Sequence, residues 1–205
     1  FGLYAKENIV NYSGDIVVNK GQLIETATSD ENGKVHFISD LPLTEFEVKE
    51  IKAPIGYSSN GKVINVDATY RGQDIETIKL EYEFKNEITK IEVSKQDITD
   101  ESEIEGAHLT VFEKDNPGAI FDSWISGQDG KNKDGTFKPH LMKGLEVGKN
   151  YVLRETSSPH GFALTQDIEF AVEDTGKVQK VTMKDELVYG ELKFNKQGEI
   201  FNEVE

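Results

Sequence analysis

The feature that most constrains this chain is a strand pattern that places an acidic residue among large apolar ones. Side chains in a strand alternate between two faces, so Tyr151, Leu153 and Glu155 share one face. Pro159 and Gly161 then break the strand and turn the chain. A carboxylate at the inner end of an apolar face is costly unless it is protonated or paired. The pattern therefore predicts a buried acid with a partner.

The same pattern occurs earlier in the chain. Phe46, Val48 and Glu50 share one parity, and Pro54 and Gly56 follow at the same offsets as in the later stretch. The repetition predicts two tandem units, each with a buried glutamate near a strand end.

Apolar residues alternate along most of the sequence, and stripes with helical spacing are scarce. Turn signals such as Asn60-Gly61, Asp129-Gly130 and Asp134-Gly135 recur between the alternating stretches. We expect an all-β fold of two tandem β-sandwich domains, residues 1–87 and 88–187, followed at 188–205 by the opening strand of a further repeat.

The pattern also gives the expected strands. In the first unit they lie at residues 1–5, 16–18, 35–38, 45–51, 63–66 and 75–86. In the second unit they lie at 91–95, 109–113, 120–125, 137–145, 151–155, 168–172 and 178–185.

Composition excludes several classes of function. The 205 residues contain no cysteine, which rules out disulfides, thiol catalysis and cysteine-based zinc sites. The formal charge of −15 argues against a nucleic-acid partner and against binding to an anionic membrane. No apolar run approaches transmembrane length, and the first residues do not form a signal peptide.

The end of the sequence repeats the start of the second unit. Leu192, Phe194 and Lys196 have the spacing of the alternating residues that end on Lys95. Phe1, in contrast, matches a residue in the second strand of the second unit, Leu109. We therefore expect the first unit to lack its lysine-bearing opening strand, as in a window cut from a tandem array.

Three polar residues of the second unit fall on apolar strand faces, near the ends of three strands. If the first and last strands are neighbours, Lys95, Glu155 and Asp185 meet inside the sandwich. Burial disfavours the charged forms of all three. A neutral lysine is a nucleophile, and a protonated Glu155 can polarise the Asp185 carboxyl that the amine attacks. The lysine and the aspartate could then condense to an amide.

Two other interpretations of these residues stay open. Lysines and acids at strand ends are usually solvated turn residues. A buried salt bridge without a covalent bond is the second alternative. Glu50 and Asn86 in the first unit also share a strand face with large apolar residues, as the three residues of the second unit do. This repetition favours the crosslink.

Several short motifs together resemble one family. They are Ser-Lys-Gln-Asp at 94–97, Arg-Glu-Thr at 154–156, Met-Lys-Asp at 183–185, Lys-Glu-Ile-Lys-Ala-Pro-Ile-Gly-Tyr at 49–57 and Phe-Lys-Asn-Glu at 84–87. The set resembles the CnaB-type (SpaA-like, prealbumin-like) domains of surface proteins and pilins of Gram-positive bacteria. The resemblance covers essentially the whole chain as two consecutive repeats.

The resemblance implies an Ig-like or prealbumin-like β-sandwich in which a first-strand lysine joins a last-strand asparagine or aspartate. A strand-end glutamate is the implied catalyst. Carried over by position, Lys95 and Asp185 are the crosslink pair of the second unit, and Glu155 is its catalyst. In the first unit the counterparts are Glu50 and Asn86, but no lysine in residues 1–87 occupies the family position.

This departure leaves two interpretations of Lys196. Residues 189–201 could complete the first domain of another copy and form an Asn86–Lys196 bond. Alternatively, Lys196 belongs to a further repeat absent from these residues.

No cofactor and no metal is expected. In the loop from Asp129, Lys131 and Lys133 occupy positions where a calcium loop needs oxygen ligands. The four histidines have no metal-ligand spacing, and we expect surface positions for His36, His108, His140 and His160. Trp124 is expected to belong to the core.

The predicted function is a stalk or spacer segment of a cell-wall-attached, extracellular adhesin or pilus-like protein. Its partners would be neighbouring repeats of the same protein. The alternative is an adhesin module that binds a host matrix protein or glycan. A turnover enzyme ranks third, because the triad would be consumed by its own product.

Overall fold

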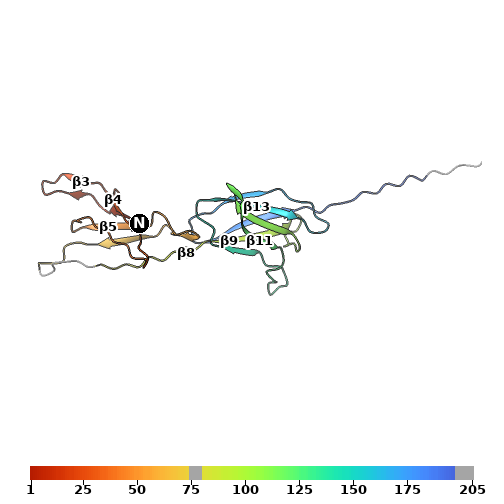
Figure 1. The fold of residues 1–205 in the computed structure, drawn as a ribbon, viewed down its shortest axis with the longest axis horizontal. Coiled ribbons are helices and arrows are strands. Elements are labelled where there is room, and N and C mark those ends of the chain that lie inside the picture. Colours follow the sequence, from red (N-terminus) through yellow and green to blue (C-terminus); the bar gives the residue numbers. More distant parts are fainter. Residues whose placement is uncertain (74–79, 197–205) are drawn as a thin grey trace, which may run out of the picture.

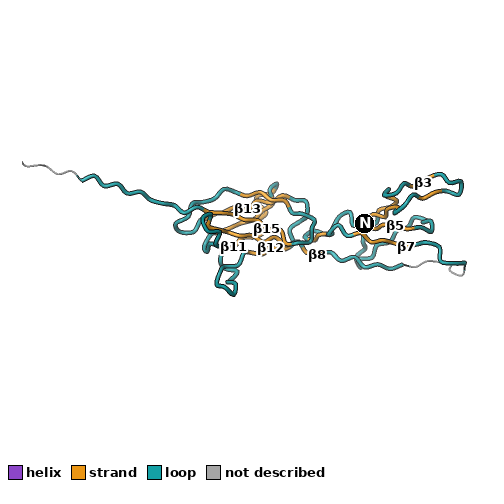
Figure 2. The backbone as a smooth tube through the Cα atoms, turned by 180° about the vertical axis from the view of Figure 1, so that it is seen from behind, coloured by secondary structure: helices purple, strands orange, loops and turns teal. Residues whose placement is uncertain are grey.

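The chain folds into two β-rich units joined end to end. The computed structural model describes residues 1–73 and 80–196, and within them it contains strands and turns but no helix. Figure 1 and Figure 2 show the two units in a line, with the C-terminal tail leaving the second unit at the end opposite the first. The predicted all-β class is confirmed, because the alternating stretches of the second unit and most of those of the first pair as strands.

The first unit is built on one four-stranded antiparallel sheet. Its strand order is β4-β1-β5-β7, and a separate hairpin pairs β2 with β3. The bounds are β1 (Gly2–Ala5), β2 (Ile9–Val10), β3 (Ile16–Val18), β4 (Leu23–Thr26), β5 (Glu45–Lys49), β6 (Tyr57–Ser58) and β7 (Val63–Asp67).

The second unit is a complete sandwich of two sheets. One sheet has the order β11-β10-β13-β14 and the other the order β12-β9-β15, with β9 antiparallel to β12 and parallel to β15. The bounds are β8 (Glu87–Ile88), β9 (Lys90–Asp97), β10 (His108–Glu113), β11 (Asn116–Ile125), β12 (His140–Lys143), β13 (Asn150–Ser157), β14 (Ile168–Ala171) and β15 (Val178–Asp185).

The two units correspond strand by strand in only one of these sheets. The first unit's β4-β1-β5-β7 sheet repeats the order of the second unit's β11-β10-β13-β14 sheet. No counterpart of β9 lies in residues 1–73 or 80–87, which agrees with the predicted absence of the opening strand. Since β9 is the central strand of its sheet, its absence removes both ladders of the second sheet.

Two strand predictions are wrong for that reason. Residues 35–38 and 80–86 alternate like strands, but the structure gives neither a strand conformation. By sequence order they would be the neighbours of the absent central strand, and a strand requires a partner for its backbone groups. The amides of Ile38 and Ser39 donate instead to the Glu25 carboxylate, at 2.8 and 2.9 Å. The remainder of the predicted 75–86 strand, up to residue 79, lies outside the described residues.

The same absence limits the first unit's core. Its fully buried apolar residues are Leu3, Ala5, Ile9 and Phe46. The second unit buries a larger set between its two sheets: Ile91, Val93, Ala107, Leu109, Val111, Met142, Leu145, Tyr151, Leu153, Val172, Val181 and Met183. A single sheet therefore carries most of the first unit's packing.

The units meet at a short sheet and a close backbone approach. β6 of the first unit pairs with β8, the Thr89 amide donates to the Gly56 carbonyl oxygen, and the Thr89 hydroxyl donates to the Leu145 carbonyl oxygen at 2.7 Å. Gly56 has φ +81°, and a Cβ there would lie 2.8 Å from the Gly144 carbonyl oxygen. Glycine is therefore required at this position by conformation and by space.

The described part of the tail leaves the second unit after Val188, whose amide donates to the Gly161 carbonyl oxygen (Figure 1). Residues 188–196 form no strand, and Leu192 and Phe194 are largely exposed. The rest of the predicted strand at 189–201 lies outside the described residues. The assignment of this segment to a further repeat stays a prediction.

We expect hydrogen exchange to distinguish the two units. No backbone amide of residues 80–86 donates a backbone hydrogen bond to another described residue, whereas the corresponding strand β15 pairs with β9 along its length. The amides of 80–86 should exchange many-fold faster than those of Val178–Asp185, because unpaired amides need no opening event. Equal protection of the two segments would contradict the missing-strand description.

Candidate functional site: a buried lysine between two carboxyl groups

Lys95 reaches the core of the second unit because of its position in β9. Alternation along β9 buries Ile91, Val93 and Lys95 on the same face. Lys95 is only 2% exposed, which is rare for a lysine unless it is paired. The sequence therefore places a primary amine inside the sandwich.

Both predicted acids meet this amine. Lys95 Nζ donates a hydrogen bond to Asp185 Oδ1, from the end of the adjacent strand β15. Glu155 reaches across from β13 in the opposite sheet, with Oε1 at 3.0 Å from Nζ. All three side chains are buried, so the structure brings together the three residues singled out by their parity.

Thr165 positions both carboxyl groups and was not found from the sequence. Its amide donates to Glu155 Oε2 at 2.8 Å, and its hydroxyl lies 2.5 Å from Asp185 Oδ1. The hydroxyl is also 3.0 Å from the Lys184 carbonyl oxygen. Thr165 lies between strands, where no periodicity marks it, so only its proximity in space reveals the role.

The site has more acid than base. Glu155 Oε1 and Asp185 Oδ2 are buried and accept no hydrogen bond, although Glu155 Oε1 faces the amine. Two ionised carboxylates beside one ammonium would leave a net negative charge in a site closed to water, which is costly. A proton on one acid, or loss of charge from the lysine–aspartate pair, removes this cost.

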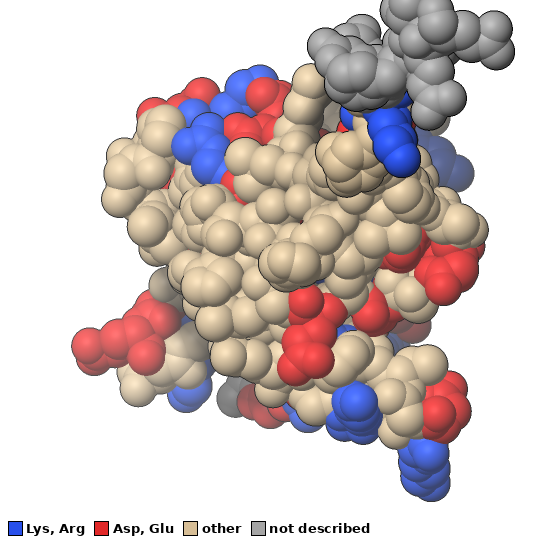
Figure 3. Space-filling view, turned by 90° about the vertical axis from the view of Figure 1, so that its right-hand side faces the viewer, with Lys and Arg blue, Asp and Glu red and all other residues tan. Residues whose placement is uncertain are grey.

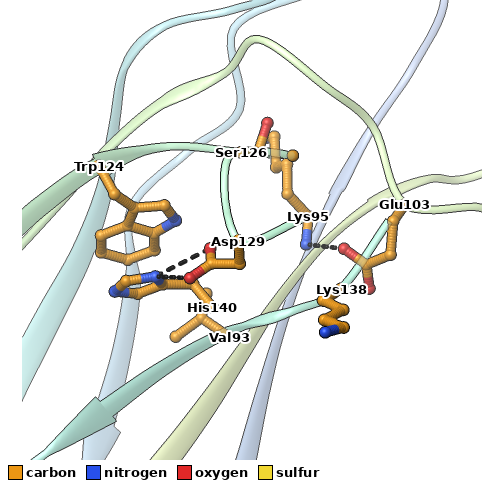
Figure 4. A pocket seen from close by; sticks show the side chains of 9 residues that line it. Val93, Lys95, Glu103, Trp124, Ser126, Asp129, Lys138 and His140 are labelled. Atoms are coloured by element: carbon orange, nitrogen blue, oxygen red, sulfur yellow. Dashed lines mark hydrogen bonds and ion pairs between the residues drawn. The ribbon is translucent and has the colours of Figure 1, made fainter. Parts of the chain in front are cut away.

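Further contacts surround Lys95 at the end of β9. Glu103 Oε2 accepts a hydrogen bond from the Lys95 backbone amide at 3.0 Å, as Figure 4 shows. Beside it, the two ring nitrogens of His140 each lie 3.0 Å from a carboxylate, those of Asp122 and Asp129.

Trp124 and His140 close this edge together. The His140 ring stacks on the Trp124 ring at a centroid distance of 4.2 Å (Figure 4). The indole is partly buried and packs against the core, as predicted. His140 was expected at the surface, but it is half-buried and ties the loop between β11 and β12 to the sandwich.

The first unit holds the corresponding acid and amide without a lysine. Asn86 Nδ2 donates to Glu50 Oε2 at 2.5 Å and to the Ser58 carbonyl oxygen at 3.3 Å. Burial raises the pKa of Glu50 above its ordinary value, against the opposing effect of the Asn86 hydrogen bond. Lys196 is exposed in the tail, and the tail leaves the second unit at the end opposite the first (Figure 1), so the structure does not bring Lys196 to Asn86 of the same chain.

An aspartate of the second unit covers this first-unit site. Asp174 accepts hydrogen bonds from the hydroxyls of Ser58 and Ser59, both at 2.5 Å, and from the Ser59 amide at 2.7 Å. Although burial acts to raise the pKa of Asp174, the serine hydrogen bonds hold it below the ordinary value of 3.8. The Ser58–Ser59 turn thus links the Glu50–Asn86 pair to the next unit.

Among the residues that the structure describes, no three His, Asp or Glu side chains gather as metal ligands. The described site brings one primary amine, that of Lys95, into contact with two carboxyl groups, those of Glu155 and Asp185.

Comparison with known proteins identifies the fold family. The SpaA prealbumin-like fold domain matches residues 1–83 and, a second time, residues 89–187. The chain belongs to this family. The predicted resemblance to SpaA-like domains is thereby confirmed for both units, whereas the predicted boundary at residues 87 and 88 stays a prediction.

Solved structures similar to this SpaA-type chain come from several bacteria. The TIE protein of Bacillus anthracis is 25% identical, with a TM-score of 0.45, over 82% of this chain and 29% of that one. BcpA, the major pilin subunit of Bacillus cereus, is 23% identical, with a TM-score of 0.36, over 47% and 28%. The minor pilin of Streptococcus agalactiae is 18% identical, with a TM-score of 0.38, over 95% and 85%.

The chain thus spans less than a third of the length of the first two of these proteins. No curated protein matches it.

We expect Thr165→Val to destabilise the second SpaA-like unit. The change keeps the side-chain volume but removes the hydroxyl beside Asp185, at a cost of about 1–3 kcal/mol in the free energy of unfolding. Urea unfolding measures it. Thr156→Val is the control, because the exposed Thr156 hydroxyl donates only to the His108 carbonyl oxygen. Equal effects of the two changes would contradict the positioning role.

The Asp174 cluster predicts a pH dependence. A lowered folded-state pKa stabilises the fold above the ordinary aspartate pKa, and this stabilisation is lost as pH falls through the folded-state value. Asp174→Asn should cost about 1 kcal/mol at pH 7, because Asp174 is otherwise exposed to solvent. Urea unfolding at pH 7 and below the ordinary value of 3.8 should show the difference shrink in acid. A cost that stays constant with pH would contradict this account.

Proposed function

We propose that this chain is a structural stalk segment of a Gram-positive cell-surface adhesin or pilus-like protein, stabilised by a Lys95–Asp185 isopeptide bond. The observation that carries the proposal is the burial of the Lys95 amine between Asp185 and Glu155. The family match supports the same role for the fold.

The geometry fits a condensation that occurs once. After Lys95 has passed a proton to Asp185, the neutral Lys95 Nζ attacks Asp185 Cγ, the Nζ–Cγ bond forms, the Cγ–Oδ2 bond breaks, and the Oδ2 hydroxyl leaves as water. Thr165 holds Asp185 Oδ1, while Oδ2 has no hydrogen-bond partner and is the oxygen that leaves. Glu155 takes the proton from Nζ and delivers one to the departing oxygen.

Proximity and charge both favour this reaction. Holding the two groups in contact can supply roughly 7–11 kcal/mol of the barrier. The product amide is neutral, so the buried lysine–aspartate charge pair no longer has to be solvated by the protein. Because Lys95 and Asp185 are used up when the amide forms, the site would react once and would not turn over.

The bond would tie the strand where the chain enters the unit to the strand where it leaves. β9 and β15 are parallel neighbours, and the crosslinked residues are separated by 90 positions. A tie of this length stabilises by about 4–5 kcal/mol on the loop-entropy argument used for disulfides. Tension between neighbouring repeats would pass through the bond and bypass most of the sandwich.

The first unit would use Glu50 and Asn86 in the same roles once a lysine-bearing strand completes it. The Asn86 amide already contacts the Glu50 carboxyl, and burial raises the pKa of Glu50 above its ordinary value. Here the leaving group would be ammonia instead of water.

An extracellular, cell-wall-attached location agrees with the composition. A net charge of −15 keeps an extended protein soluble and self-repelling. Figure 3 shows acidic and basic side chains interspersed around a mostly uncharged surface at the end where the tail leaves. Within residues 1–73 and 80–196, no helix is long and apolar enough to span a membrane.

Intact mass of the denatured chain tests the proposed bond. We expect a mass lower by one water, with the crosslinked peptides containing Lys95 and Asp185 after digestion. Glu155→Gln should restore the full mass and lower the free energy of unfolding by several kcal/mol, about the size of the crosslink contribution.

Lys184→Ala is the matched control, since this neighbouring lysine pairs with Glu101 at the surface. It should keep the water deficit. A full unmodified mass of the natural sequence would falsify the isopeptide proposal.

A further inference from the structure

β9 extends past the end of its neighbour β12 before it reaches Lys95. The ladder between β9 and β12 ends at Val93, which lies opposite His140, whereas the ladder between β9 and β15 continues to Asp97. A strand end that is paired on one side only frays more easily, because its other backbone groups are open to water. The place of the Lys95 amine therefore depends on what holds the β12 side of its backbone.

The chain that follows β9 folds back and supplies this contact. The Asp97 amide donates to the Ser102 carbonyl oxygen at 2.9 Å, and the Ile104 amide donates to the Lys95 carbonyl oxygen at 2.7 Å. Facing residues of an antiparallel pair at such a position normally exchange two backbone hydrogen bonds. The Lys95 amide donates instead to a side-chain oxygen, Glu103 Oε2, at 3.0 Å (Figure 4). A carboxylate thus takes the place of a backbone acceptor beside Lys95.

Both carboxylate oxygens of Glu103 contact the end of β9. Oε1 accepts a hydrogen bond from Gln96 Nε2 at 3.4 Å, next to the bond from the Lys95 amide to Oε2. A backbone bridge also holds Glu103 opposite Gln96. The Glu103 carboxylate contacts the main chain of Lys95, whereas the Lys95 amine contacts Asp185 and Glu155. Glu103 can therefore fix the lysine's backbone without taking part in proton transfer.

Glu103 also forms part of the boundary between Lys95 and the surface. A cavity of about 10 Å³ adjoins Lys95 and is lined by Glu103, Trp124, Ser126, Lys138 and His140 among others (Figure 4). This volume is close to the space that one water molecule needs. Loss of the Glu103 carboxylate would widen the cavity. Because a lysine amine is a better nucleophile when it is desolvated, a wider cavity would make Lys95 less reactive.

We propose that Glu103 is a positioning residue for the amide-forming reaction. Its carboxylate holds the backbone of Lys95 so that the amine stays against Asp185 and Glu155 and away from water. This inference rests on the proposed Lys95–Asp185 bond and adds no step to that reaction. A displacement of the reacting groups by about 1 Å can slow a reaction about 100-fold, so loss of the Glu103 contact should change the rate.

The rate of bond formation tests this role. The full chain is made by cell-free synthesis, and its intact mass is followed over time as one water is lost. Glu103→Ala should lose the water at least about tenfold more slowly, because the Lys95 amide no longer has its side-chain acceptor. Glu103→Gln should react within about twofold of the natural rate, since its side chain keeps an oxygen that can accept the same hydrogen bond.

Glu113→Ala is the matched control. Glu113 is a half-buried glutamate of the same unit, and its carboxylate lies 3.0 Å from Lys149 Nζ. It ends β10 opposite Tyr151, whereas Glu155 lies opposite Leu109, near the other end of that strand. The change should leave the rate of water loss unchanged. Urea unfolding of both alanine variants, each combined with Glu155→Gln to prevent the bond, measures whether they lose similar stability.

Acetylation of Lys95 is a second measurement, and it does not require the bond. In the Glu155→Gln chain, brief treatment with acetic anhydride should acetylate exposed lysines such as Lys180 and leave Lys95 unmodified, as read from peptide masses. Adding Glu103→Ala should raise the acetylation rate of Lys95 at least about tenfold, because the freed strand end opens more often. Adding Glu113→Ala should not.

The outcomes separate this inference from the stalk proposal. Equal rates of water loss in Glu103→Ala and the natural chain would overturn the positioning role and leave the stalk proposal intact, as would equal slowing in Glu113→Ala. A Glu103→Gln chain as slow as Glu103→Ala would overturn the role of the hydrogen bond. A natural chain that keeps its full mass would overturn the proposed bond. Acetylation then decides the role of Glu103, and equal protection of Lys95 with and without the Glu103 carboxylate would overturn it.

Discussion

The second unit depends on β9, because this central strand forms hydrogen bonds with a neighbour on each side. β9 pairs with β12 and β15 and buries Ile91 and Val93 between the two sheets. The same face delivers the Lys95 amine to Asp185 and Glu155. One strand therefore completes the core and the candidate reactive site. Where residues 1–73 and 80–87 lack its counterpart, the described first unit has neither an equivalent of the β12-β9-β15 sheet nor a lysine beside Glu50.

Lys95, Glu155 and Asp185 are buried, although burial disfavours their charged forms. Each of the three would be better solvated in water, and together they carry more acid than base. The fold retains them because Thr165 donates to both acids and because all three side chains are buried beside the apolar core. This arrangement gives the proposed amide bond a thermodynamic rationale, since fewer buried charges remain after condensation.

Parity in the sequence was sufficient to find the residues that point inward from regular strands. Lys95, Glu155 and Asp185 follow apolar neighbours at a spacing of two, and the structure places all three together. Strand pairing was harder to predict. Residues 80–86 alternate like a strand, but this alternation does not show whether a neighbouring strand is present. Thr165 and Asp174 lie in connecting segments, where position depends on the packing of distant elements and leaves no local periodic signal.

The junction between the units has a consequence for any longer array. β6 pairs with β8, Gly56 lies against Gly144, and Asp174 is bound to Ser58 and Ser59. These contacts lie at different places around the connection, so together they oppose swivelling of one unit about the long axis. Successive repeats joined in this way would keep a constant rotational phase. A surface patch on one face of each repeat would then recur at a fixed rotation about the long axis from one repeat to the next.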